Sequence, residues 1–202
     1  MMEYLFKTSA ETEIILASAS PRRSEILSSM GIEFQIVPSG VDEESIKGPP
    51  EVLVERLSLL KAEDVSRSYP NHWIVGGDTV VVVNNEILGK PSDREHARVM
   101  LQKLSGTTHS VFGGVTLMHR EDGVQKSFVC ESEVTFIDLS DECIQRYISS
   151  DECFDKAGSY AIQGQGQFFV EQIVGSYTNI VGIDAQKTAL LLLEQGAIEW
   201  RR

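Results

Sequence analysis

The sequence has no hydrophobic run long enough to cross a membrane, and it has few cysteines. No stretch approaches the ~18 consecutive apolar residues that a membrane-spanning helix needs, so we expect no membrane partner. The first thirteen residues contain no apolar core of signal-peptide length, so we expect no export. Cys130, Cys143 and Cys153 show neither a CxxC motif nor a cysteine–histidine metal spacing. Free thiols in odd number suit a reducing compartment, and we expect a cytoplasmic protein.

Positive charge is also scarce. The chain carries 18 lysines and arginines against 30 acidic residues, which gives a formal net charge of −12 at pH 7. Proteins that coat nucleic acid need a positive stripe for the phosphate backbone, so this balance argues against a nucleic-acid partner. Where an acidic chain still gathers basic residues at a few points, a small anion held together with a divalent metal is the better expectation. The composition therefore favours a nucleotide as ligand.

The length of 202 residues and the hydrophobic content of 42% are enough for a full core. We expect one α/β domain over residues 1–202, with 1–13 as a loosely ordered N-terminal extension.

Residues 108–119 and 124–139 have the pattern of two long strands joined by a tight turn, which places an antiparallel pair in the middle of the sheet. Ser92 with Glu95 predicts a capping box at the start of a helix, and residues 175–179 predict a turn.

A basic turn follows the first apolar segment. Ile14–Leu16 is typical of a buried strand, and Ser20 followed by Pro21 predicts a helix N-cap with proline at the first helical position. Arg22 and Arg23 then fall in the first helical turn, where the helix dipole disfavours a cation by roughly 0.3–1 kcal/mol each. Free backbone N–H groups beside two guanidinium groups indicate a phosphate site. A solvated basic turn is the alternative interpretation.

Asp78 is the strongest single-residue indication of function. It interrupts the nearly continuous apolar run 73–83, which is typical of a strand buried on both faces. A carboxylate in such a strand costs several kcal/mol unless it has a partner. The alternative is a turn aspartate between two shorter strands, which Gly76–Gly77 would allow. The four valines that follow favour the continuous strand, with the turn at Asn84–Asn85.

Three further segments carry candidate residues whose interpretation stays open on spacing alone. The acidic loop Val41–Glu44 could hold Mg²⁺ or be solvated and idle. Lys61 falls at the edge of the apolar face of a helix, where a snorkelling side chain is the alternative. The glycine-rich stretch 154–166 suits close approach to a ligand, and Gln163 within it could offer a donor and an acceptor to a base edge.

Taken together, six segments resemble the Maf family of nucleoside triphosphate pyrophosphatases, which is related in fold to the inosine triphosphate pyrophosphatases. They occur in family order over most of the chain: Leu16–Arg23, Val41–Glu44, Lys61–Ala62, Gly77–Val81, Leu88–Pro91 and Asp155–Gly164. The resemblance implies a mixed, elongated twisted sheet flanked by helices, a cleft between two lobes, and a homodimer. The chain departs from the family pattern at Gly77, where alanine is common, and at two segments, Phe112–Gly114 and Ile183–Ala185.

The resemblance also implies an activity. Maf enzymes hydrolyse a nucleoside triphosphate between its α- and β-phosphates and release pyrophosphate, a house-cleaning role in the nucleotide pool. The branch acting on dTTP and UTP is similar to this sequence at Arg22, Thr79 and Gln163. Modified uridine triphosphates are further candidate substrates. A 7-methyl-GTP pyrophosphatase, whose branch has a glutamate-bearing segment in place of Gln163, and a nucleotide-sensing regulator of septum formation remain alternatives.

Site roles follow from the same resemblance. Asp78 is expected as the general base or water-orienting carboxylate, with Lys61 and Lys90 as further catalytic groups. Glu43 and Asp78 are the expected ligands of a divalent cation, with Mg²⁺ as the first candidate and Mn²⁺ or Co²⁺ as alternatives. The residues expected to bind substrate are Ser18, Arg22, Arg23, Thr79 and Gln163.

Overall fold

The computed structural model describes residues 4–10, 12–43 and 45–201, so residues 1–3, Glu11, Glu44 and Arg202 lie outside the described residues. The chain divides into two compact units. The first consists of Met1–Asp78, Gly113–Val129 and Gly182–Arg202, and the second of Thr79–Phe112 and Cys130–Val181. The single domain expected over residues 1–202 stays a prediction. No helix among the described residues is long and apolar enough to cross a membrane.

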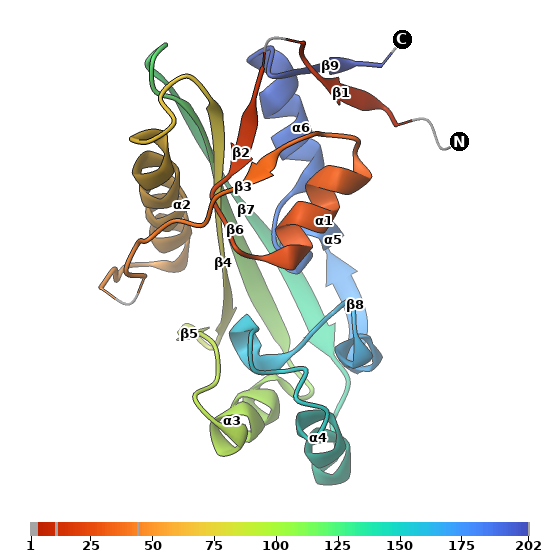
Figure 1. Ribbon diagram of the computed structural model, residues 1–202. Helices are drawn as coiled ribbons and strands as arrows, with labels where there is room; N and C mark the ends of the chain where they lie inside the picture. Colours follow the sequence, from red (N-terminus) through yellow and green to blue (C-terminus); the bar gives the residue numbers. More distant parts are fainter. Residues whose placement is uncertain (1–3, 11, 44, 202) are drawn as a thin grey trace. The chain divides into compact units, whose positions relative to one another are not determined.

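Helices and strands are interspersed along the chain (Figure 1). In chain order they are β1 (Phe6–Thr8), β2 (Ile14–Leu16), α1 (Pro21–Ser29), β3 (Gln35–Ile36), α2 (Pro50–Ser66), β4 (Trp73–Val83), β5 (Glu86–Leu88), α3 (Arg94–Leu104), β6 (Thr108–His119), β7 (Val124–Phe136), α4 (Asp141–Ile148), the short 3₁₀ helices η1 (Ala157–Ser159) and η2 (Gln165–Phe169), β8 (Val170–Val174), α5 (Tyr177–Val181), α6 (Ala185–Glu194) and β9 (Ile198–Trp200).

The main sheet is mixed. Its strand order is β3-β2-β4-β6-β7-β8, and β5 pairs with β4. β2 runs parallel to β3 and to β4, with Ile15 opposite Gln35 and Ile74, whereas β5 and β8 pair antiparallel with β4 and β7. This arrangement confirms the predicted α/β class with a mixed sheet and helices.

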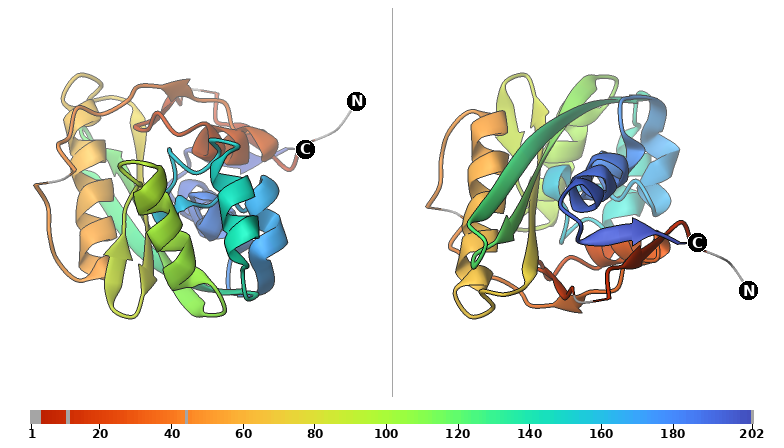
Figure 2. Two further views of the ribbon diagram at one scale, coloured as in Figure 1. Left: turned by 90° about the horizontal axis from the view of Figure 1, so that it is seen from below. Right: turned by 90° about the horizontal axis from the view of Figure 1, so that it is seen from above.

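A second, small sheet joins the two ends of the described chain. Phe6–Thr8 forms β1 and pairs antiparallel with β9 (Figure 2). Phe6 lies opposite Trp200, and the two ring centroids are 4.8 Å apart. The segment 1–13 was expected to be loosely ordered, yet its described part contains this strand. The difference arises because the strand's partner lies almost two hundred residues away, beyond the reach of local patterns.

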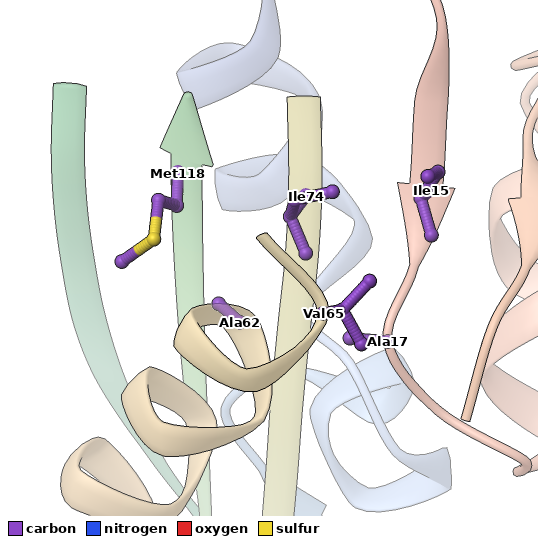
Figure 3. Packing of buried hydrophobic residues seen from close by; sticks show 6 residues of the cluster. All are labelled: Ile15, Ala17, Ala62, Val65, Ile74 and Met118. Atoms are coloured by element: carbon purple, nitrogen blue, oxygen red, sulfur yellow. The ribbon is translucent and has the colours of Figure 1, made fainter. Parts of the chain in front are cut away.

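The core of the first unit lies between α2 and the sheet. Ala62 and Val65 of α2 face Ile15, Ile74 and Met118 of the strands (Figure 3). All five side chains are buried, with exposed fractions of 5% or less. Burial of such apolar surface contributes roughly 25 cal/mol per Å², so this contact fixes α2 on the sheet. Lys61, the residue before Ala62, is held in place with it.

Two glycines let the backbone of α2 approach the sheet closely. A Cβ atom at Gly76 would lie 2.2 Å from the carbonyl oxygen of Ser58, and one at Gly114 would lie 2.3 Å from that of Val54. The Ser58 hydroxyl also shares a 2.9 Å hydrogen bond with the Thr116 hydroxyl. Since both of these carbonyl oxygens belong to the backbone of α2, the two glycines set the distance between α2 and the sheet.

The second unit contains a cluster of aromatic rings. His109 lies edge-on to Phe136 and Tyr160, and its Nε2 shares a 2.9 Å hydrogen bond with the Tyr160 hydroxyl. Burial lowers the pKa of His109 to about 4, so the ring is neutral at pH 7. Phe169 packs against Phe136 and against Tyr147 of α4. These contacts anchor Tyr160 and Phe169, the two ends of the segment that precedes β8.

Two local predictions are wrong in detail. α3 begins after Asp93, whose carboxylate accepts a 2.8 Å hydrogen bond from the backbone of His96, in place of the predicted Ser92–Glu95 capping box. A charged acceptor interacts more strongly with the helix dipole than a hydroxyl does. The turn predicted at 175–179 contains the start of α5, and buried Asn179 within this helix donates to the carbonyl of Val111, 3.0 Å away.

We expect Gly76→Ala to destabilise the first unit by about 2 kcal/mol, since the new methyl group would meet a helix backbone that cannot move without repacking. Urea unfolding measures this loss. Gly89→Ala is the matched control, because nothing lies within 4 Å of a Cβ atom there. Equal stability of the two variants would contradict the proposed role of Gly76 as a contact for α2.

Candidate active site

The turn between β2 and α1 has the predicted helix start. Ser20 is the N-cap residue and Pro21 follows at the beginning of the helix. The hydroxyl at the centre of this turn is that of Ser18, which is buried and accepts two hydrogen bonds. One comes from the backbone N–H of Ser20 at 3.2 Å and the other from Nη1 of Arg23 at 2.9 Å. Ser18 and Arg23, both predicted to bind substrate, are therefore in direct contact.

Arg23 is held on two sides. Its Nε donates to the carbonyl oxygen of Gly182 at 2.9 Å, and a Cβ atom at Gly77 would lie only 3.3 Å from the same nitrogen. Burial lowers the pKa of the guanidinium, while the charges of Asp78 and Glu43 oppose that shift. An arginine stays protonated in any protein environment, so the positive charge of half-buried Arg23 interacts with the two carboxylates.

Lys61, Asp78 and Glu43 form the central ion cluster of the first unit. Nζ of Lys61 lies 2.7 Å from Oδ1 of Asp78 and 2.8 Å from Oε1 of Glu43. The side chains of Lys61 and Asp78 are 6% and 8% exposed, whereas that of Glu43 is 54% exposed. The snorkelling interpretation of Lys61 is wrong, because its ammonium group lies at a buried carboxylate. The continuous-strand interpretation of Asp78 is confirmed.

α2 also holds the acidic loop that carries Glu43. Oδ2 of Asp64, one turn after Lys61 on the same helix, accepts a 2.8 Å hydrogen bond from the backbone N–H of Gly40. Within the loop, the backbone N–H of Ile46 donates to the carbonyl oxygen of Glu43 at 3.3 Å. One helix thus positions both the ammonium group and the loop that faces it. Local patterns do not predict this role of Asp64, since an aspartate on the surface of a helix has no distinguishing spacing.

The donor set fits a small, hard divalent cation. Glu43 and Asp78 already converge on one positive atom, and carboxylate oxygens are the ligands that Mg²⁺ prefers. Among the described residues, no group of three or more His, Cys, Asp or Glu side chains has a metal-binding arrangement. Mg²⁺ is commonly held by one or two carboxylates together with substrate phosphates and water, so two protein ligands suffice.

Three predicted site residues belong to the second unit. Thr79 follows Asp78 directly in β4 and is half-buried. Lys90 is exposed after β5, and Gln163 is exposed in the turn before η2. The structure therefore brings together Ser18 with Arg23, and Lys61 with Asp78 and Glu43, within the first unit. The roles of all these residues, and of half-buried Arg22, stay predictions.

We expect Lys61→Met to lower the free energy of unfolding by about 3 kcal/mol, because it leaves the buried Asp78 carboxylate without its partner. Urea unfolding at pH 7 measures the loss. The double variant Lys61→Met, Asp78→Asn should regain most of it, since no uncompensated charge then remains. Lys103→Met, which breaks an exposed pair with Glu86, is the control and should cost about 1 kcal/mol or less. A double variant no more stable than Lys61→Met would contradict the ion-pair account.

Comparison with known proteins assigns the chain to a family. A relative from Syntrophus aciditrophicus named "dTTP/UTP pyrophosphatase" is 43% identical over 188 residues, which is 92% of this chain and 91% of that protein. One of the same name from Geotalea uraniireducens is 48% identical over 192 residues, or 94% and 98%. The fold is similar to that of the Staphylococcus aureus Ham1 protein, with a TM-score of 0.50 and 16% identity over 91% of this chain and 99% of that one. The sequence model described as "Maf-like protein" matches residues 13–195, and the chain belongs to this family.

Proposed function

We propose that this protein hydrolyses dTTP and UTP to the nucleoside monophosphate and pyrophosphate. The relatives named dTTP/UTP pyrophosphatase, 43% and 48% identical over most of the chain, support this substrate class. The structural observation that carries the proposal is the convergence of Asp78 and Glu43 on the ammonium group of Lys61. Modified uridine triphosphates are further candidate substrates. The homodimer and the cytoplasmic location stay predictions.

Attack on the α-phosphate needs an oriented water, a base for its proton, and positive charge for the departing pyrophosphate. Asp78 is the proposed base. Its carboxylate is fixed by the 2.7 Å contact with Lys61 and has a second oxygen, Oδ2, with which to accept a proton from water. Because the carboxylate is already oriented, little reorganisation is needed when substrate binds.

The phosphates are assigned to the basic groups. Arg23, with its guanidinium fixed by Ser18 and Gly182, offers planar N–H donors that suit phosphate oxygens. The Ser18 hydroxyl, whose oxygen accepts from Ser20 and Arg23, adds a further donor through its own proton. Lys90 of the second unit is proposed to balance the remaining phosphate charge.

A divalent cation is proposed to bind at Glu43 and Asp78. Maf-family pyrophosphatases generally depend on such a metal, and Mg²⁺ is our first candidate, with Mn²⁺ and Co²⁺ as alternatives. When bound, the ion would neutralise phosphate charge and polarise the phosphoryl oxygens. Glu43 suits this role because its side chain is more than half exposed and can exchange the Lys61 contact for a metal.

Recognition of the base is assigned to Arg22, Thr79 and Gln163. A uracil-type edge presents two carbonyl oxygens and one N–H group, and a glutamine carboxamide can complement either kind. Discrimination of this sort depends on hydrogen-bonding groups that the wrong base leaves unpaired.

We expect Asp78→Asn to lower kcat for dTTP by at least roughly 10²-fold, because the amide keeps the shape of the side chain and removes its basicity. Pyrophosphate release with Mg²⁺, Mn²⁺ or a chelator measures the rate, and circular dichroism checks folding. Asp122→Asn, which changes an exposed carboxylate that pairs with the buried His119, is the control. Wild-type turnover by folded Asp78→Asn would overturn the assigned role.

We expect Gln163→Glu to lower kcat/KM for dTTP and UTP by roughly tenfold, since a carboxylate accepts but cannot donate to the base edge. The side chain is exposed, so folding should be unaffected. A panel of canonical nucleotides, modified uridine triphosphates and 7-methyl-GTP measures the change. An unchanged profile would remove Gln163 from the specificity set, and a wild-type preference for 7-methyl-GTP would replace the proposed substrate.

A further inference from the structure

Gln163 lies in a tight turn of the second unit. The backbone N–H of Gly164 donates to the carbonyl oxygen of Ala161 at 3.1 Å, which closes the turn around Ile162 and Gln163. Ala161 and Ile162 are buried, and Gln163 is exposed. The direction of an exposed side chain at such a position depends on the backbone beneath it. What holds that backbone therefore decides where the carboxamide of Gln163 can reach.

Tyr147 holds the turn on its N-terminal side. Its hydroxyl oxygen accepts a 2.9 Å hydrogen bond from the backbone N–H of Ala161, two residues before Gln163. The ring is 4% exposed and packs edge-on against Phe169 with centroids 4.8 Å apart. The hydroxyl is thus carried by a side chain that packing has already fixed, on α4.

Glu152 holds the turn on its C-terminal side. Its carboxylate accepts the backbone N–H of Gln165, two residues after Gln163, with Oε2 at 2.9 Å and Oε1 at 3.3 Å. A Cβ atom at Gly164 would lie 1.8 Å from Oε1, so this carboxylate occupies the space that any other residue would fill. The backbone of Glu152 is itself tied down, since its carbonyl oxygen accepts from Nζ of Lys156 at 2.8 Å.

The two supports also interact electrostatically. Burial raises the pKa of the Tyr147 hydroxyl, and the nearby charge of Glu152 acts in the same direction. Gln163 is therefore bracketed by a tyrosine hydroxyl on one side and a carboxylate on the other, each bonded to a backbone N–H of the turn.

We infer that Tyr147 and Glu152 are positioning residues for nucleotide specificity, which act by fixing the turn that presents Gln163. The inference rests on the proposed function, in which Gln163 contacts the base. A loosely held turn would have to be ordered on each binding event, and that cost falls on substrate binding. Neither side chain needs to touch the nucleotide for this effect, so both are distinct from the assigned site residues.

The test compares Glu152→Ala and Tyr147→Phe with the control Glu142→Gln, which changes an exposed pair with Arg146 on the same helix as Tyr147. For both test variants we expect kcat/KM for dTTP and UTP to fall roughly three- to tenfold, the loss expected for one hydrogen bond. The fall should appear in KM, with kcat within about twofold of wild type. The ratio of kcat/KM for dTTP to that for dCTP should fall with it.

A double-mutant cycle separates positioning from folding. In a Gln163→Ala background, Glu152→Ala should not change the dTTP to dCTP ratio further, because its effect passes through Gln163. Equal losses for all nucleotides, or an unchanged ratio in folded variants, would overturn the inference. If Glu152→Ala does not fold, Tyr147→Phe decides, since it removes one oxygen and keeps the packed ring. Failure of the wild-type protein to release pyrophosphate from dTTP or UTP would instead refute the proposed function.

Discussion

The buried ion pair between Lys61 and Asp78 is the interaction on which the first unit depends. Each charge would be expensive alone in this environment, and each is tolerated because the other lies 2.7 Å away. The pair therefore demands a fixed distance between α2 and β4. The glycines at positions 76 and 114 provide that distance, since a side chain at either would collide with the helix backbone. The departure from the family pattern at Phe112–Gly114 thus includes one residue with a clear packing role.

The same cluster explains why a highly charged substrate would need additional cations. Lys61 and Arg23 carry two positive charges, and Asp78 and Glu43 carry two negative ones, so the four groups are formally neutral as a set. A triphosphate adds several negative charges that this set does not balance. The proposed divalent cation and the remaining basic side chains would supply the missing positive charge. The arginine at the start of α1 is consistent with this account, because its unfavourable position beside the helix dipole is offset by nearby carboxylates.

Local patterns predicted the features that depend on neighbouring residues. The start of α1 at Pro21 and the turn at Asn84–Asn85, where both residues have positive φ, are as expected. The partner of Lys61 was not predictable from spacing. Helical periodicity places this residue at the edge of the apolar face of its helix, but it does not show which residue lies opposite. The pairing of β1 with β9 was not predictable for the same reason, since a three-residue strand carries little information about a partner so distant in sequence.

The residues that position the candidate groups were the hardest to predict from the sequence. In the first unit Asp64 accepts from the backbone N–H of Gly40 and holds the loop of Glu43, and in the second unit Glu152 accepts from that of Gln165 beside Gln163. Both use a charge-assisted bond from a carboxylate to a backbone N–H, which is strong and well directed. Any residue except proline supplies such a donor, so the sequence of the loop does not reveal its anchor. A motif can therefore identify the groups that perform the chemistry while giving no indication of the carboxylates that hold them, and only the fold shows which acidic side chains those are.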